Sequence, residues 1–139
     1  MSEFQGGSLS FLVRQAWLSM RSAIEAELRV HGLSVAQYAT LIIVEDHPGC
    51  SNADVGRAVS SSRQSANELL VGLERDGLIM RGPHPRDRRT QQLSLTELGR
   101  RRLEEARPAV TRREDELEAA FTDDQREVVR EWLARMARV

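Results

Sequence analysis

Four arginines lie close together near the middle of the chain, namely Arg81, Arg86, Arg88 and Arg89. A guanidinium group is a planar fork of five N–H donors, which suits phosphate oxygens and the acceptor edge of guanine. Residues 57–102 hold ten arginines against five acidic residues, whereas residues 1–56 and 103–139 each carry a net charge of −3. The total of −1 therefore conceals a basic middle, which predicts an anionic partner there. Chance clustering of surface charge is the alternative.

A polar helix face precedes this basic loop. Four apolar residues share a narrow arc of the helical wheel and predict its buried side. They are Ala66, Leu69, Leu70 and Leu73. On the rest of the helix, glutamine and asparagine can pair with two atoms of adenine, and serine can reach bases or phosphates. An ordinary solvated face would look similar, but the arginines that follow favour DNA. The residues expected to contact DNA are Ser62, Arg63, Gln64, Ser65, Asn67 and Glu68.

Asp87 is an acidic residue inside the basic loop. A carboxylate next to DNA repels phosphate, so its presence calls for a structural reason. It could hold a neighbouring guanidinium by a forked ion pair and so aim that group into a narrow minor groove. A plain solvated ion pair is the alternative. The residues expected to contact DNA from this loop are Arg86, Asp87, Arg88 and Arg89.

The remaining reactive residues do not form a catalytic or metal-binding pattern. Cys50 is the only cysteine, and although it precedes a helix start that favours a thiolate, an inert thiol is the preferred interpretation. The three histidines are far apart, and metal-ligand spacing, phosphate-binding glycine loops and nucleophile motifs are absent from the sequence. We therefore expect no enzymatic activity, no metal and no cofactor.

The length and composition suit one ordinary globular domain. The chain has 139 residues, of which 40% are hydrophobic and 29% charged. It contains no apolar run near the ~20 residues that a membrane span requires. The polar N-terminus does not look like a secretory signal, so the sequence predicts a cytoplasmic protein.

Apolar spacing and capping motifs predict four helices in the first part of the chain. The first runs from about Ser8 to Val30 and ends at Gly32. Two capping boxes, Ser34-x-x-Gln37 and Ser61-x-x-Gln64, open the second and fourth helices. The second ends at residues 47–49, the third covers residues 52–59 with Ser51 as its cap, and the fourth ends at Gly77.

The second part of the chain predicts a β-hairpin followed by more helices. Leu78–Met80 and Gln91–Leu95 read as two short strands around the loop Arg81–Thr90. A fifth helix begins at Thr96, and Pro108 should kink or break it. Residues 114–120 look helical again, and the capping box Thr122-x-x-Gln125 opens a last helix.

Helix, turn, helix and hairpin in this order predict a winged helix-turn-helix fold, mainly α with a small β-hairpin wing. The end helices carry apolar stripes without a partner in so small a chain, which predicts a homodimer. We expect a single domain over residues 1–139, with a DNA-binding lobe at residues 34–95 and dimerisation helices at residues 8–31 and 96–139. The expected interface residues are Leu12, Val128, Trp132, Leu133 and Met136.

Three runs of this sequence resemble the signature of the multiple antibiotic resistance regulator (MarR) family. They are Leu73-Glu74-Arg75-Asp76-Gly77-Leu78-Ile79, Asp87-Arg88-Arg89 and Thr96-Glu97-Leu98-Gly99, and Ser65-Ala66 fits the start of the signature. The resemblance covers about residues 8–139 and implies a homodimeric regulator of transcription, usually a repressor released by a small ligand or by oxidation. It also implies that Arg89 enters the minor groove. Glu68 departs from the family pattern, so operator sequence and affinity cannot be carried over.

The resemblance also implies a crevice for a small aromatic or amphipathic effector between the DNA-binding lobe and the dimer helices. Its candidate residues are Arg14, Trp17, Met20, Arg21, His31 and Tyr38. Plain dimer core is the alternative for Trp17 and Met20. The family's peroxide sensors carry their cysteine near the first helix, which Cys50 does not match. The expected partners are double-stranded DNA, which would place the protein at the nucleoid, and a second copy. A winged-helix module that binds a protein rather than DNA is the alternative.

Overall fold

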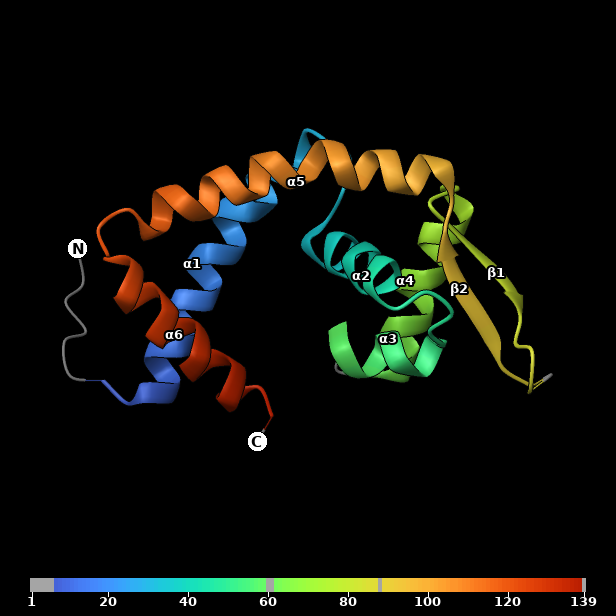
Figure 1. Cartoon of the computed structure of the whole chain (residues 1–139), viewed down its shortest axis with the longest axis horizontal. Helices are drawn as coiled ribbons and strands as arrows, with labels where there is room; N and C mark the ends of the chain where they lie inside the picture. Colours follow the sequence, from blue (N-terminus) through green and yellow to red (C-terminus); the bar gives the residue numbers. More distant parts are fainter. Residues whose placement is uncertain (1–6, 60–61, 88, 139) are drawn as a thin grey trace.

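The structure, a computed structural model, describes residues 7–59, 62–87 and 89–138. These residues form helices and one antiparallel β-hairpin along a long central helix (Figure 1). In chain order the elements are α1 (Leu9–Arg29), α2 (Val35–Asp46), α3 (Asn52–Val59), α4 (Arg63–Arg75), β1 (Ile79–Pro83), β2 (Gln91–Leu95), α5 (Glu97–Glu118) and α6 (Asp123–Met136). The mainly α fold with a hairpin wing is as predicted.

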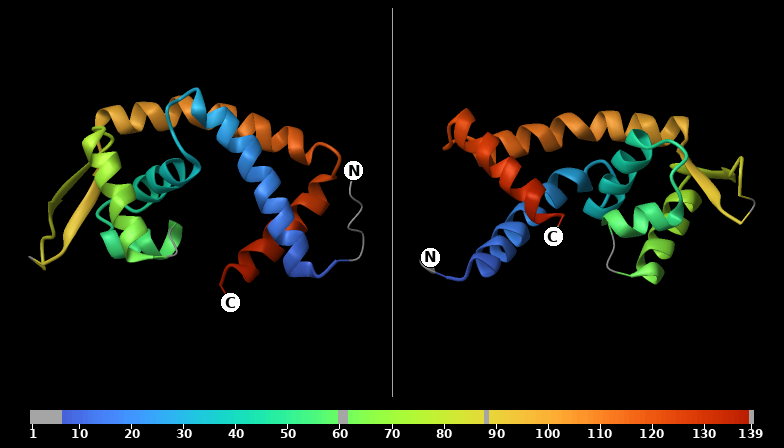
Figure 2. Two further views of the ribbon diagram at one scale, coloured as in Figure 1. Left: turned by 180° about the vertical axis from the view of Figure 1, so that it is seen from behind. Right: turned by 60° about the horizontal axis from the view of Figure 1, so that its bottom comes forward.

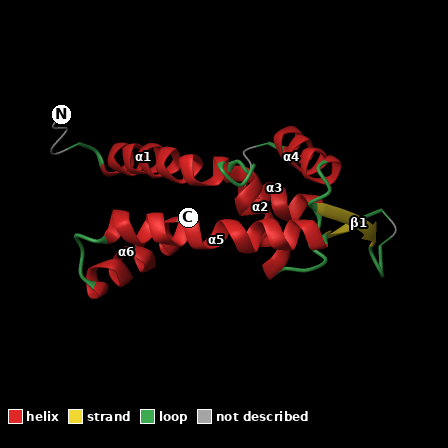
Figure 3. Cartoon of the chain, turned by 90° about the horizontal axis from the view of Figure 1, so that it is seen from above, coloured by secondary structure: helices red, strands yellow, loops and turns green. Residues whose placement is uncertain are grey.

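Helices α2, α3 and α4 and the hairpin form a lobe at one end of α5, while α6 and the first turns of α1 lie at the other end (Figures 1 and 2). Seen from above, α1 runs beside α5, and α6 overlaps the far end of α5 (Figure 3). The buried core joins the lobe to α5 and to the C-terminal half of α1. Its fully buried members include Leu28, Leu41, Leu70, Leu93 and Leu103.

Side-chain caps set the helix starts, as expected, with one correction. Ser34 and Gln37 form the predicted capping box, and Ser51 exchanges hydrogen bonds with Asp54 at the start of α3. The cap of α4 is Ser62 rather than Ser61, because the Ser62 hydroxyl accepts from the Ser65 N–H at 3.1 Å. Ser61 itself lies outside the described residues.

The hairpin is longer than predicted on its first strand. Ile79 pairs with Leu95, and the ladder continues to Pro83 opposite Gln91. Composition suggested a loop from Arg81 onward, but both strands of a two-stranded sheet are edges, where proline and glycine are tolerated. Ile79 and Leu93 face the core, and Gly77 supplies the positive φ of 75° that turns the chain from α4 into β1.

Pro108 was predicted to kink or break the fifth helix. The break is wrong, because α5 is continuous from Glu97 to Glu118 with Pro108 inside it. Proline removes one backbone hydrogen bond, which leaves the Glu104 carbonyl without its donor. Both residues are exposed, so water can replace that bond. Ala106 and Val110 are buried on either side of the proline and hold both halves of the helix against the core.

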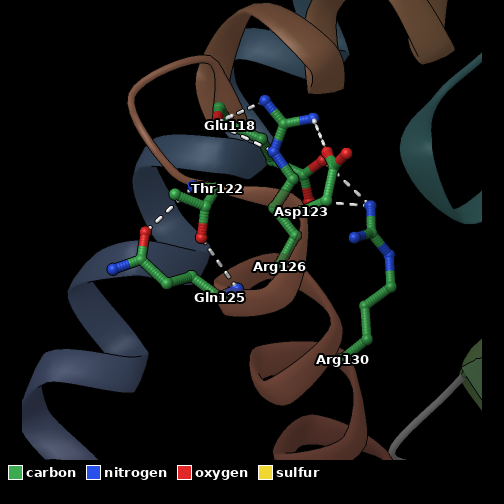
Figure 4. A network of polar contacts seen from close by, with 6 residues as sticks. All are labelled: Glu118, Thr122, Asp123, Gln125, Arg126 and Arg130. Atoms are coloured by element: carbon green, nitrogen blue, oxygen red, sulfur yellow. Dashed lines mark hydrogen bonds and ion pairs between the residues drawn. The ribbon is translucent and has the colours of Figure 1, made fainter.

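Helix α6 is attached to α5 by polar contacts. The Arg126 guanidinium donates twice to the Glu118 backbone carbonyl, at 3.1 and 2.8 Å, and Arg130 donates to both oxygens of the Glu118 carboxylate (Figure 4). The Thr122–Gln125 capping box opens the helix as predicted. Helix α6 has no buried residue among those described, so within one chain its apolar side remains uncovered.

Candidate nucleic-acid interface

Helix α4 presents a polar face whose opposite side is anchored in the core. Ala66, Leu70 and Leu73 are buried as the helical wheel predicted. The residues predicted to contact DNA from this helix are all exposed: Ser62, Arg63, Gln64, Ser65, Asn67 and Glu68. The structure therefore brings the whole predicted set onto one accessible stretch formed by the N-cap and the first turns of α4.

Four of these side chains are already paired with one another in α4 and its N-cap. The Ser62 hydroxyl donates to the Ser65 hydroxyl at 2.9 Å, so Ser65 belongs to the helix cap as well as to the exposed face. The Gln64 amide Nε2 donates to Glu68 Oε1 at 3.3 Å. Asn67 lies between them in sequence and lines a hollow between α3 and α4, together with Asn52, Ala53, Gly56, Arg57, Ser62, Arg63, Gln64 and Ala66.

The wing loop is held by side chains that bind its backbone. His84 Nδ1 accepts from the backbone N–H of Arg86 at 3.1 Å and of Asp87 at 3.0 Å. The Asp87 carboxylate accepts from the Arg89 N–H at 2.9 Å and from the Thr90 hydroxyl at 3.0 Å. These bonds hold the pKa of the Asp87 carboxyl below its ordinary value, because they favour its charged form.

This geometry changes the expected role of Asp87. Among the described residues its carboxylate accepts from one backbone N–H and one hydroxyl of the loop rather than from a guanidinium. The side chains of Arg86 and Arg89 are exposed. Arg88 lies outside the described residues. His84 was missed as a supporting residue, since an isolated histidine in a loop carries no sequence signal.

Arg81 is not a free wing arginine. Its Nε lies 3.0 Å from Glu74 Oε2, and its side chain is only 16% exposed. The pair joins the last turn of α4 to β1, so it orients the wing relative to the helix. The spacing of the arginines could not reveal this, because Glu74 meets Arg81 only after Gly77 has reversed the chain.

The six predicted effector residues do not gather into one cavity within a single chain. Arg14, Trp17, Met20 and Arg21 are exposed along α1, and His31 is half-buried in the turn that follows it. Tyr38 is half-buried on α2, where burial raises the pKa of its phenol while nearby Arg107 opposes that shift. Arg107 also donates to Glu45 at 2.7 Å, so it connects α5 to α2.

Most of the predicted dimer-interface residues are exposed in the single chain. Leu12, Val128, Leu133 and Met136 are exposed and Trp132 is half-buried. Further large apolar residues are exposed on α1 and α6, namely Leu9, Phe11, Val13, Trp17, Leu18, Met20 and Val129.

Cys50 is buried in the core, with 8% of its surface exposed, and this burial raises the pKa of its thiol. A protonated, inaccessible thiol reacts slowly with oxidants.

The exposed polar helix α4 beside the basic β-hairpin has the arrangement of a winged helix-turn-helix fold. The model of the MarR family matches residues 31–90. A putative transcriptional regulatory protein for the hcr operon of Thauera aromatica is 28% identical over 133 residues, which cover 95% of this chain and 80% of that protein. These matches confirm the resemblance to the MarR family that the signature runs indicate.

Solved structures of regulators have the same fold. The transcriptional repressor CouR bound to a 23-mer DNA duplex superposes with a TM-score of 0.86 at 29% identity, over 98% of this chain and 99% of that one. CouR from Rhodococcus jostii RHA1 bound to p-coumaroyl-CoA superposes with a TM-score of 0.87 at 24% identity, over 98% and 96%. The predicted class, a DNA-binding regulator of transcription with a second copy as partner, is confirmed. The matched proteins are regulators rather than enzymes. Within the described ranges, no helix is long and apolar enough to cross a membrane.

Proposed function

We propose that this regulator is a repressor that binds a pseudo-palindromic operator as a homodimer, with α4 in the major groove and the wing in the minor groove. The observation that carries the proposal is that the polar and basic surface lies at one end of α5 and the uncovered apolar surface lies at the other. The exposed polar face of α4 and the wing arginines lie at one end, and the uncovered apolar faces of α1 and α6 lie at the other. Pairing two copies through the apolar end leaves both DNA-reading ends free.

The two DNA-contacting elements have different tasks. Gln64, Ser65 and Asn67 contact base edges, because the N-terminal part of a recognition helix lies deepest in the groove. Arg86 and Arg88 contact phosphates, and Arg89 enters the minor groove, where the negative potential is strongest. Two such units related by a two-fold axis read half-sites about one helical turn, ~34–36 Å, apart.

Selection of bound sequences from random duplex DNA tests this proposal. The wild-type protein should enrich a pseudo-palindrome. Asn67→Ala should then weaken operator binding by ~1–3 kcal/mol and leave random DNA nearly unaffected, because it removes a base contact. Arg86→Ala should weaken both in similar proportion and reduce the salt slope by about one. A wild-type protein that enriches no sequence would instead support a winged-helix module for protein partners.

The effector of this regulator is proposed to be a small aromatic or amphipathic molecule bound between the lobe and the dimer helices. Tyr38 supports this placement, since it is half-buried beside Arg107 at the junction of α2 and α5. An arginine next to an aromatic ring suits a carboxylated ring. The release of operator DNA by 4-hydroxybenzoate, measured for the wild type and for Arg107→Ala, tests this. Release that is equal in both proteins would place the effector elsewhere. The proposed site of action is the nucleoid, in the cytoplasm.

A further inference from the structure

Glu68 is an acidic residue on the proposed DNA face, and its nearest described partner is Gln64, one helical turn earlier. Gln64 Nε2 donates to Glu68 Oε1 at 3.3 Å, and both side chains are exposed. The side chains on the buried side of α4 fix the rotation of the helix, so both residues are held on its outward face. A negative charge here weakens the attraction of DNA, which makes it costly unless it has a recognition role.

The hydrogen bond fixes which end of the Gln64 amide faces Glu68. A carboxylate only accepts hydrogen bonds, so the NH2 group of the amide must point towards it. One N–H is used in this contact, and the second N–H and the amide oxygen remain available. These two groups are the pair that binds adenine N7 and N6. Glu68 therefore holds Gln64 in a defined orientation, and its second oxygen, Oε2, has no hydrogen bond from the described residues and can accept one from DNA.

We propose that Gln64 and Glu68 read two neighbouring base pairs as one unit, with Gln64 on adenine and Glu68 on cytosine. This inference rests on the proposed placement of α4 in the major groove. A carboxylate needs a donor, and the major-groove edges of guanine and thymine present only acceptors at N7, O6 and O4. Cytosine presents its N4 amino group without an adjacent ring acceptor, whereas adenine places acceptor N7 beside its amino group.

The spacing of the two residues fits neighbouring base pairs. Four residues of an α-helix rise about 6 Å along its axis, and consecutive base pairs are separated by about 3.4 Å. A helix that lies obliquely in the groove reduces the component of that rise along the DNA. The same carboxylate also rejects a guanine or thymine placed at the cytosine position, because two acceptors would then face each other without a proton.

Sequence selection with three proteins tests this inference. Wild-type protein should enrich a cytosine at one fixed position of each half-site, with guanine at that position binding roughly 5- to 150-fold more weakly, the range of one base contact. Glu68→Ala should lose the preference at that position and bind random duplex DNA more tightly, because a negative charge is gone. Glu68→Gln should move the preference from cytosine to adenine, since glutamine pairs with two atoms of adenine.

A matched control separates base reading from a general charge effect. Glu105→Gln removes the same charge from an exposed position of α5 and should leave every base preference unchanged. Retention of the cytosine preference in Glu68→Ala, or its absence from sites enriched by the wild type, overturns the inference while the proposed operator binding stands. If the wild type enriches no sequence, operator binding itself fails and this inference fails with it.

Discussion

Gly99 lies where α5 crosses the turn between α4 and the wing, and a single added methyl group there should destabilise the protein. A Cβ at this position would lie 2.0 Å from the Leu78 carbonyl oxygen and 2.9 Å from the Leu78 carbonyl carbon. Ordinary contact distances are about 3.5 Å or more, so the two backbones would have to separate by about 1.5 Å. Neither can move easily, because Thr96 N–H donates to the same Leu78 oxygen at 3.1 Å.

The expected magnitude follows from three contributions. Replacing glycine by alanine inside a helix stabilises by ~0.5–1 kcal/mol when space is available. Overpacking against a fixed neighbour costs typically ~1–3 kcal/mol and sometimes more, and losing the Thr96–Leu78 hydrogen bond costs about 1 kcal/mol. We therefore expect Gly99→Ala to lower the free energy of unfolding by about 1–3.5 kcal/mol, the sum of these terms.

Gly72→Ala is the matched control. Gly72 lies in the interior of α4, where an added Cβ would meet only the tip of Arg75, at 3.9 Å. This variant should gain ~0.5–1 kcal/mol. Thermal unfolding at one fixed protein concentration, which a dimer requires, should show Gly99→Ala melting roughly 5–15 °C below wild type and Gly72→Ala slightly above it. A Gly99→Ala protein as stable as wild type would refute the close approach of α5 to Leu78.

Three further outcomes are expected. Leu133→Asp should dissociate or unfold the dimer, because it places an unpaired charge in a buried interface. If the wild type sediments as a stable 15.7 kDa monomer at micromolar concentration, the dimer is contradicted. Cys50→Ser should leave the operator affinity unchanged, with or without peroxide, because burial keeps the thiol protonated; peroxide release that the substitution abolishes would show a redox sensor. Asp87→Ala should weaken operator binding despite removing a negative charge, since Arg89 and Thr90 lose their acceptor, and tighter binding would rule out this support. Because the pKa of Asp87 is lowered in the fold, its support of the wing is complete above the ordinary carboxyl pKa of about 3.9. This support is lost as pH falls through the lower folded value, which NMR of the Arg89 amide, the N–H that donates to the carboxylate, can follow.

Local rules predicted most helix starts from the sequence. The boxes at Ser34 and Thr122 required only a hydroxyl and a glutamine three residues later, which are interactions within one turn. The α4 cap was misplaced by one residue because Ser61 and Ser62 are both competent caps. The sequence offers no means of choosing between neighbours of equal chemistry, and in the structure it is the Ser62 hydroxyl that accepts from the Ser65 N–H.

The candidate DNA surface was predictable where it depends on helical periodicity. The outward positions of Gln64, Asn67 and Glu68 follow from the burial of Ala66 and Leu70 on the opposite side of the same helix. The wing was less predictable. A count of arginines cannot distinguish exposed Arg86 from Arg81, which Glu74 holds, since the distinction arises from a chain reversal.

The sequence by itself determined most of the elements, their order and the resemblance to the MarR family, because these depend on periodicity, capping residues and short motifs that act over a few positions. The tertiary structure decided which residues support the site. Pro108 stays helical because buried neighbours on both sides compensate for one lost hydrogen bond. Asp87 serves the loop backbone because the nearest donors there are N–H and hydroxyl groups. Gly99 is required because the Leu78 backbone, twenty-one residues earlier, lies against it. Each outcome depends on contacts between groups that come within a few ångströms of each other only in the folded chain, so no local sequence pattern could predict it.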